Sequence, residues 1–140
     1  MKRFASVLCV IMFLGLHSAH AANSPEALVE EYKRALSQSD IKSLIALVAF
    51  SPESEKYRNS IEAQFRSRFN KKIVSAKIVP FSTYESDYKA SIARGVKPIL
   101  EPKGWLIVEF SRSELGQGAS VGITSVFLVG TRAGSYYLSS

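Results

Sequence analysis

Hydrophobic residues in the first half of the chain recur every four positions, a spacing that places side chains on one stripe of an α-helix. The first such stretch follows Ser24-Pro25, which supplies a helix N-cap and a proline at the first helical position. We expect this helix to end within residues 37–39. Its apolar stripe is formed by Leu28, Tyr32 and Leu36.

Two further helices are predicted before the pattern changes. Asp40 is placed to cap a short helix over residues 41–48, which is so apolar that we expect burial on most of its sides. Ser51-Pro52-Glu53 repeats the start signal of the first helix, and the third helix is expected to run from there to a stop at Asn70. Its stripe consists of Tyr57, Ile61, Phe65 and Phe69.

The second half of the chain has the β-branched, alternating pattern that is typical of strands. Between them, residues 82–103 are expected to hold a short helix around 87–93 and an extended piece at 96–100. Short connections between the later strands favour an antiparallel meander. The sequence therefore predicts an α+β fold, with three N-terminal helices packed on a curved antiparallel sheet. The predicted strands cover residues 73–81, 105–110, 120–129 and 136–138, with turns at 115–118 and 132–134.

The first 21 residues have the layout of a secretory signal peptide, with a basic start, an apolar run and a small-x-small exit. These parts are Lys2-Arg3, residues 4–16 and Ala19-His20-Ala21. Spanning a bilayer as a helix takes about 20 residues, and the apolar run is shorter than this. We therefore expect cleavage and export, most simply to the periplasm, with an uncleaved membrane anchor as the alternative. One domain over residues 22–140 would remain.

Cleavage would decide much of the available chemistry. It would remove Cys9, His17 and His20, which are the only cysteine and the only histidines of the chain. Ser-His or Cys-His nucleophilic catalysis would then be excluded, as would zinc held by histidine or thiolate ligands. We expect no metal, no cofactor and no disulfide.

The charge of the chain gives a weaker indication about partners. The net charge is +6, and it falls to +4 when Lys2 and Arg3 are removed. A charge of this size favours solubility and a weak contact with an anionic envelope surface. The basic residues form no polybasic tract, so nucleic acid is not an expected partner.

Parts of the chain resemble the nuclear transport factor 2-like superfamily, whose members fold as a cystatin-like α+β cone. The similarity to its first helix and the start of its second lies in Pro25-Glu26-Ala27-Leu28-Val29-Glu30-Glu31-Tyr32, Ala35-Leu36 and Ser39-Asp40-Ile41. The similarity to its last hairpin lies in Phe127-Leu128-Val129, Gly134 and Tyr136-Tyr137. The resemblance implies a conical pocket between the helices and the sheet. It leaves the activity open, because the superfamily includes isomerases, dehydratases, transport adaptors and exported domains.

Six residues are candidates for a binding site in such a pocket. Trp105 and Glu109 share one face of their strand, and Ser125 interrupts an apolar face of the next strand. Glu109 on the solvent face and Ser125 as a filler in the sheet are the alternatives. Tyrosines on the helix stripes could place a hydroxyl at the pocket mouth, although core packing explains them more simply. The six candidates are Tyr32, Tyr57, Trp105, Glu109, Ser125 and Tyr136.

Three functions remain open from the sequence. The leading hypothesis is a non-catalytic exported domain, monomeric or homodimeric, that binds a small apolar ligand or a protein partner in the cone or on the sheet face. The second is a small lyase or isomerase with Glu109 or Asp87 as base and a tyrosine as hydrogen-bond donor. The third is a structural envelope-associated protein whose own side chains fill the cone. A buried pocket carboxylate would favour the second, and a filled cone would favour an interaction role.

Overall fold

The computed structural model describes residues 22–111 and 122–139, so the predicted signal peptide and the turn predicted at 115–118 lie outside it. The fold is α+β, as predicted: three N-terminal α-helices precede a four-stranded antiparallel sheet that is not closed into a barrel. The helices are α1 (Pro25–Ser37), α2 (Ile41–Ala46), α3 (Arg58–Arg66) and α4 (Glu85–Ala93), with 3₁₀ turns η1 (Glu55–Tyr57) and η2 (Phe81–Tyr84). The strands are β1 (Ile73–Pro80), β2 (Glu101–Phe110), β3 (Ile123–Arg132) and β4 (Ser135–Ser139), adjacent in that order.

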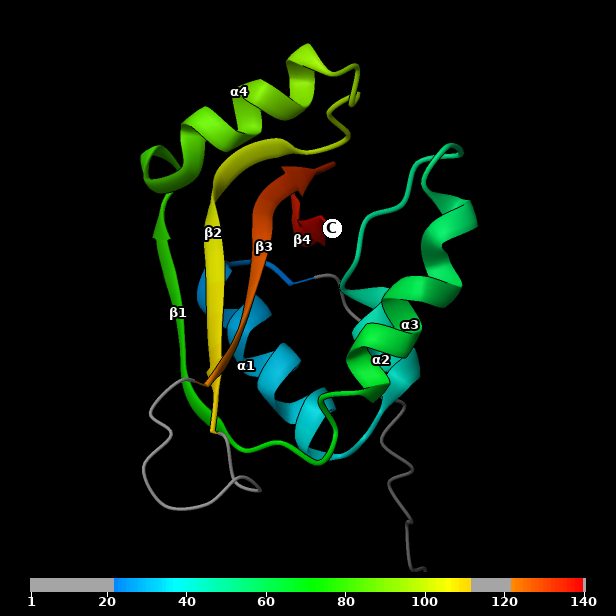
Figure 1. The fold of residues 1–140 in the computed structure, drawn as a ribbon, viewed down its shortest axis with the longest axis vertical. Coiled ribbons are helices and arrows are strands. Elements are labelled where there is room, and N and C mark those ends of the chain that lie inside the picture. Colours follow the sequence, from blue (N-terminus) through cyan, green and yellow to red (C-terminus); the bar gives the residue numbers. More distant parts are fainter. Residues whose placement is uncertain (1–21, 112–121, 140) are drawn as a thin grey trace, which may run out of the picture.

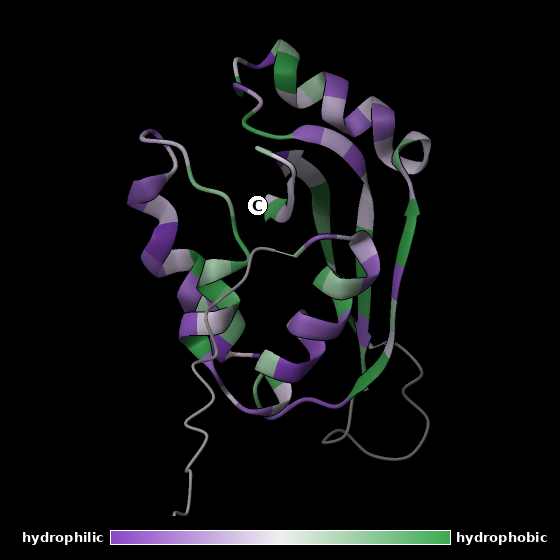
Figure 2. Ribbon diagram, turned by 180° about the vertical axis from the view of Figure 1, so that it is seen from behind, coloured by the Kyte–Doolittle hydropathy of each residue, from purple (hydrophilic) through white to green (hydrophobic). Residues whose placement is uncertain are grey.

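The helices α1, α2 and α3 lie on one side of the sheet, and α4 lies at the end where β2 begins (Figure 1). Seen from behind, the helices carry both hydrophilic and hydrophobic residues (Figure 2), as expected for helices that pack with one side only. We call the sheet face toward α1–α3 the inner face and the opposite one the outer face.

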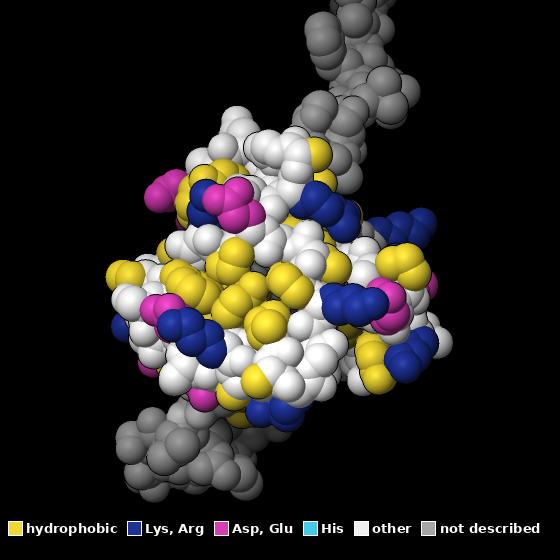
Figure 3. All heavy atoms as spheres, turned by 90° about the horizontal axis from the view of Figure 1, so that it is seen from above, with side chains coloured by type: hydrophobic (Ala, Val, Ile, Leu, Met, Phe, Trp, Pro, Cys, Tyr) yellow, Lys and Arg dark blue, Asp and Glu magenta, His cyan; other side chains and the backbone are white. Residues whose placement is uncertain are grey.

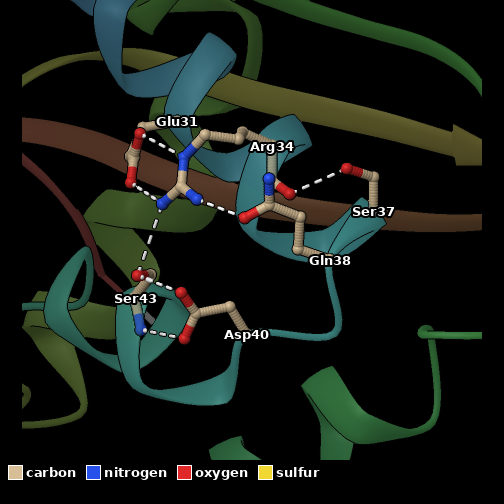
Figure 4. A network of polar contacts seen from close by, with 6 residues as sticks. All are labelled: Glu31, Arg34, Ser37, Gln38, Asp40 and Ser43. Atoms are coloured by element: carbon tan, nitrogen blue, oxygen red, sulfur yellow. Dashed lines mark hydrogen bonds and ion pairs between the residues drawn. The ribbon is translucent and has the colours of Figure 1, made fainter. Parts of the chain in front are cut away.

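The corner between α1 and α2 follows the predicted capping. Ser24 Oγ accepts a hydrogen bond from the Ala27 amide at the start of α1, and Asp40 Oδ1 accepts one from the Ser43 amide at the start of α2. The hydroxyl and backbone of Ser43 both donate to Asp40 and lower the pKa of its carboxyl. Arg34 pairs with Glu31 and reaches across to Ser43, which ties the two helices together (Figure 4).

The third helix begins later than the sequence predicted. Ser51 and Ser54 exchange hydrogen bonds between hydroxyls and backbone amides, which closes a separate turn, and α3 starts only at Arg58. Serine side chains compete with a helix in this way when they bond to nearby backbone. Ile61 and Phe65 are buried as expected, but Tyr57 precedes the α-helix and is 55% exposed, so the prediction that it packs in the core is wrong.

The inner face of the sheet carries the core. Leu106, Val108 and Phe110 of β2 point to this face and are fully buried, while the intervening residues of β2 point outward, which confirms the predicted division of faces. The rings of Tyr32 and Phe65 contact each other and Phe127, with centroids 5.8 to 6.2 Å apart. These aromatic rings therefore occupy the space between the helices and the sheet.

The remaining parts of the fold are α4, the start of β2 and the hairpin of β3 and β4. The short helix expected around 87–93 is α4, and β2 begins at Glu101, four residues before its predicted start. Ala133 and Gly134, both with positive φ, form the two-residue turn between β3 and β4, and this backbone matches the twist of a hairpin. Residues 47–49 and Ala22 bond to the other side of β4, so this edge of the sheet is covered.

Candidate functional site

A groove of about 640 Å³ lies on the outer face of the sheet, near the end where β2 begins. One wall comes from α4 and the segment that leads from it to β2, within residues 87–100. The other wall comes from residues 49–57, between α2 and α3. The sheet supplies the floor through Trp105, Val126, Leu128 and Ser139.

Exposed hydrophobic side chains gather in this groove. Five large hydrophobic residues of the described chain are exposed, and all but Val74 line the groove. Seen from above, hydrophobic side chains form a continuous patch in the middle of the surface, with charged residues around it (Figure 3). A contiguous apolar patch of this kind is typical of a surface that binds a ligand or a partner. The four groove residues are Tyr57, Ile92, Val96 and Val126.

An aromatic cluster fixes the first wall to the sheet. The Trp105 indole Nε1 donates to the Phe81 carbonyl at 2.9 Å, and the two rings are stacked with centroids 6.2 Å apart. Tyr84 meets Trp105 edge-on, and Tyr88 of α4 meets Phe81 edge-on. The cluster holds α4 in place and leaves part of Trp105 at the groove.

The second wall is anchored to β4. Leu138 donates to the Leu47 carbonyl and accepts from the Ala49 amide, both at 2.8 Å, so residues 47–49 run alongside the strand. The turn at Ser51 and Ser54 then leads the chain over the groove. Both walls therefore rest on regular structure, which favours a preformed site over one assembled by the ligand.

The charges around the groove are balanced. Among the described residues, two positive and two negative side chains line the groove, namely Lys56, Lys97, Glu53 and Asp87. Hydrogen bonds from its own backbone amide and from Ser51, assisted by nearby Lys97, lower the pKa of Glu53. An apolar floor with a balanced rim fits an uncharged apolar group better than an ion.

Two of the six predicted site residues, Tyr57 and Trp105, come together in this groove. Glu109 shares the outer face with Trp105 but lies outside the groove, where it is exposed and accepts a hydrogen bond from Ser75 Oγ at 2.8 Å. Ser125 pairs with Val108 and points to the inner face. Glu109 and Ser125 thus lie on opposite faces of the sheet and do not share a pocket.

The other two predicted site residues lie on the inner side. Tyr32 is fully buried among core residues, its hydroxyl has no hydrogen-bond partner among the residues that the structure describes, and burial raises its pKa to about 12. Tyr136 is half-buried against the core, and its amide donates to the Ala22 carbonyl. Neither lines the groove.

The residues that sequence reasoning missed lie in and after α4. Ile92 and Val96 line the groove, although this region was expected only to hold a short helix and an extended piece. A signal was present, since Tyr88, Ile92 and Val96 are spaced four apart. All three residues with this spacing line the groove.

No family model, curated protein sequence or solved structure matches the chain. Within residues 22–111 and 122–139, no group of three or more His, Cys, Asp or Glu side chains is arranged to hold a metal ion. In that same part of the chain, no helix is both long enough and apolar enough to cross a membrane.

Proposed function

We propose that the protein is an exported, non-catalytic binding protein that holds a small apolar ligand in the groove on the outer face of its sheet. The observation that carries this proposal is the gathering of exposed hydrophobic side chains in one concave site. The volume of the groove lies within the range of small-molecule sites, about 300 to 1,000 Å³. The balanced rim charge favours a ligand that is uncharged where it meets the floor.

The filled interior favours the outer face over the cone. Tyr32, Phe65 and Phe127 occupy the position in which a conical pocket was expected. A filled cone also supports an interaction role over catalysis in the interior. Between the two locations expected from the sequence, the sheet face is thus the better supported.

Family membership and export form part of the same proposal. Three helices followed by an antiparallel sheet are what a nuclear transport factor 2-like protein would have, and this arrangement supports membership. Export to the periplasm rests on the pattern of residues 1–21 alone. Binding of apolar molecules suits an exported protein without cysteine or histidine, because it requires shape and apolar surface only.

The alternative is a lyase or isomerase, and one arrangement favours it: Asp87 lines the groove together with Tyr57 and Tyr88. These are the residue types that a base and an oxyanion donor require. Asp87, however, is exposed on α4, and Glu109 lies outside the groove. Ligand binding needs no water-excluded carboxylate and is therefore the function we favour.

The chain provides its own reporter for a binding experiment. Trp105 is the only tryptophan, and it lies at the groove. The neutral apolar probe N-phenyl-1-naphthylamine should bind saturably and accept excitation energy from Trp105. A probe that gains fluorescence without energy transfer from Trp105 would place the binding elsewhere and contradict the proposal.

Two valines give a matched pair for the same measurement. Val126 lies in the groove and is 44% exposed, whereas Val74 lies on edge strand β1 outside it and is 63% exposed. Val126→Lys should weaken probe binding about tenfold or more, because a charge would meet apolar surface. Val74→Lys should leave binding within about twofold of the original. Equal effects of both variants would rule the groove out.

Native mass spectrometry of the protein from its host's periplasmic or secreted fraction tests the natural occupant. A co-purifying small molecule that is lost on denaturation would support the ligand proposal. A mass without ligand, in a protein that also fails to bind the probe, would favour a protein partner on the same face. The same spectrum reports whether the protein is a monomer or a homodimer.

A further inference from the structure

A second concave site, which we call the cationic cleft, lies at the opposite end of β2 from the groove. It has a volume of about 470 Å³ and is bordered by the second half of α1 and by the connection from α3 to β1. The cleft is separate from the groove, since the two share no residue. Its lining consists of Glu30, Lys33, Arg34, Leu36, Ser37, Phe69, Lys71, Lys72 and Ile73.

The cleft carries an excess of positive charge. Among the described residues, four basic side chains and the carboxylate of Glu30 line it, and Arg34 is paired with Glu31 beside it. Lys33 pairs with Glu30 at 3.0 Å on the surface, where such pairs contribute little and an anion can compete for the lysine. Lys71 and Lys72 form no ion pair with any residue of the described chain. The cleft therefore offers positive charge to an external group.

Hydrogen bonds hold the backbone of Lys71 and Lys72. The Lys72 carbonyl accepts a hydrogen bond from the Ser111 amide at 2.8 Å, and the Lys71 amide donates to the Arg68 carbonyl at 3.0 Å. Across the cleft, the Arg34 guanidinium is held by Glu31, Gln38 and Ser43 (Figure 4). Anchored cations lose less entropy on binding an anion than cations on mobile loops.

The cleft also has an apolar part. Leu36 is buried in the core, and Phe69 and Ile73 are partly buried against it while still lining the cleft. An inorganic anion would use the lysines and leave this surface in water. A molecule with an anionic head and an apolar body would use both.

From this combination we propose that the cationic cleft binds an anionic phospholipid, with the phosphate at Lys71 and Lys72 and the adjoining apolar part on Phe69 and Ile73. The proposal does not depend on the function of the groove. The net charge favours a weak contact with an anionic envelope surface, and the cationic cleft would be the place of that contact.

The test is a titration with short-chain lipids below their critical micelle concentration. Binding is monitored through the NMR amide resonances of the isotopically labelled protein. Dihexanoyl phosphatidylglycerol should shift the resonances of residues 69–73 and of α1 saturably. Dihexanoyl phosphatidylcholine and inorganic phosphate should each bind about tenfold more weakly, because each lacks either the net charge or the apolar part. Binding should weaken as salt is raised, since the contacts are exposed.

Two double variants sharpen the result. Lys71→Gln/Lys72→Gln should weaken binding of dihexanoyl phosphatidylglycerol about fivefold or more. Lys42→Gln/Lys77→Gln removes the same charge outside the cleft and should change the affinity less than about twofold. Circular dichroism confirms that both variants are folded.

Three results would overturn the proposal. One is equal binding of the two lipids, and another is phosphate binding as tight as that of phosphatidylglycerol, which would indicate a simple anion site. The third is an equal loss in both double variants, which would indicate attraction to the net charge alone. Val126→Lys, which alters the groove, should leave the lipid affinity unchanged, so failure at one site is distinguishable from failure at the other.

Discussion

Leu106 and Ile107 are neighbours in β2, yet Leu106 is fully buried and Ile107 is only half-buried. Successive side chains of a strand point to opposite faces, so the difference reports what covers each face. The inner face is covered by α1–α3, whereas the outer face near the groove is open to solvent. Apolar residues thus stabilise the fold on one face and remain accessible to solvent on the other.

The largest expected effect comes from testing this difference directly. Leu106→Ala should lower the free energy of unfolding by about 2–5 kcal/mol, because it leaves a cavity in a packed core. Ile107→Ala should cost about 1 kcal/mol, because a half-buried side chain loses less contact. Urea unfolding followed by circular dichroism measures both. Equal losses would mean that the two faces do not differ in packing.

A smaller loss of stability is expected at Trp105, where η2 covers part of the outer face. Trp105 holds η2 and α4 through its ring contacts and its hydrogen bond to Phe81. Trp105→Ala should cost about 2 kcal/mol, less than the loss of a fully buried tryptophan.

The loss at Trp105 should also be local, which hydrogen exchange can measure. Amides of α4 should exchange faster in the variant than the loss of global stability alone would cause. Amides of α1 should exchange faster only by the amount that this global loss explains. Accelerated exchange spread evenly over the molecule would show that α4 is not held by this cluster.

The next largest loss of stability is expected from removing the cap of α2, on the inner side of the molecule. Asp40→Ala should cost about 1 kcal/mol at neutral pH, since the Ser43 amide loses its acceptor. The folded state lowers the pKa of Asp40 below its ordinary 3.8, so the stabilisation is present above that pH and is lost as the pH falls below it. The free energies of unfolding of the original protein and of Asp40→Ala should therefore converge in acid. A constant difference at all pH values would show that the charge of Asp40 plays no part.

The sequence predicted the inner side better than the outer side. Spacing and caps located α1, and alternation located the faces of β2, because these signals arise within one element. Tyr57 was misplaced because the hydrogen bonds between Ser51 and Ser54 displaced the start of α3. The groove could not be located, because its walls meet only after residues 49–57 and 87–100 cross the same end of the sheet.

The energetic cost of the Tyr32 hydroxyl on the inner face can be measured. Within residues 22–111 and 122–139 this buried hydroxyl has no hydrogen-bond partner, and a buried unpartnered polar group costs about 1–3 kcal/mol. Tyr32→Phe should therefore leave the stability unchanged or raise it by about 1 kcal/mol. Tyr32→Leu is the control, because it also loses the ring contacts with Phe65 and Phe127 and should be clearly destabilised.

The pH dependence of Tyr32→Phe separates the hydroxyl from the ring. Burial raises the pKa of Tyr32 from 10.0 to about 12, so the folded state favours the neutral phenol. The folded protein should lose stability as the pH rises from 10 toward 12, and Tyr32→Phe should lose less over the same range. Unfolding curves at neutral pH and in alkali measure both effects. If Tyr32→Phe is instead less stable by more than about 1 kcal/mol at neutral pH, the hydroxyl is bonded to an internal water and the inner face is not wholly apolar.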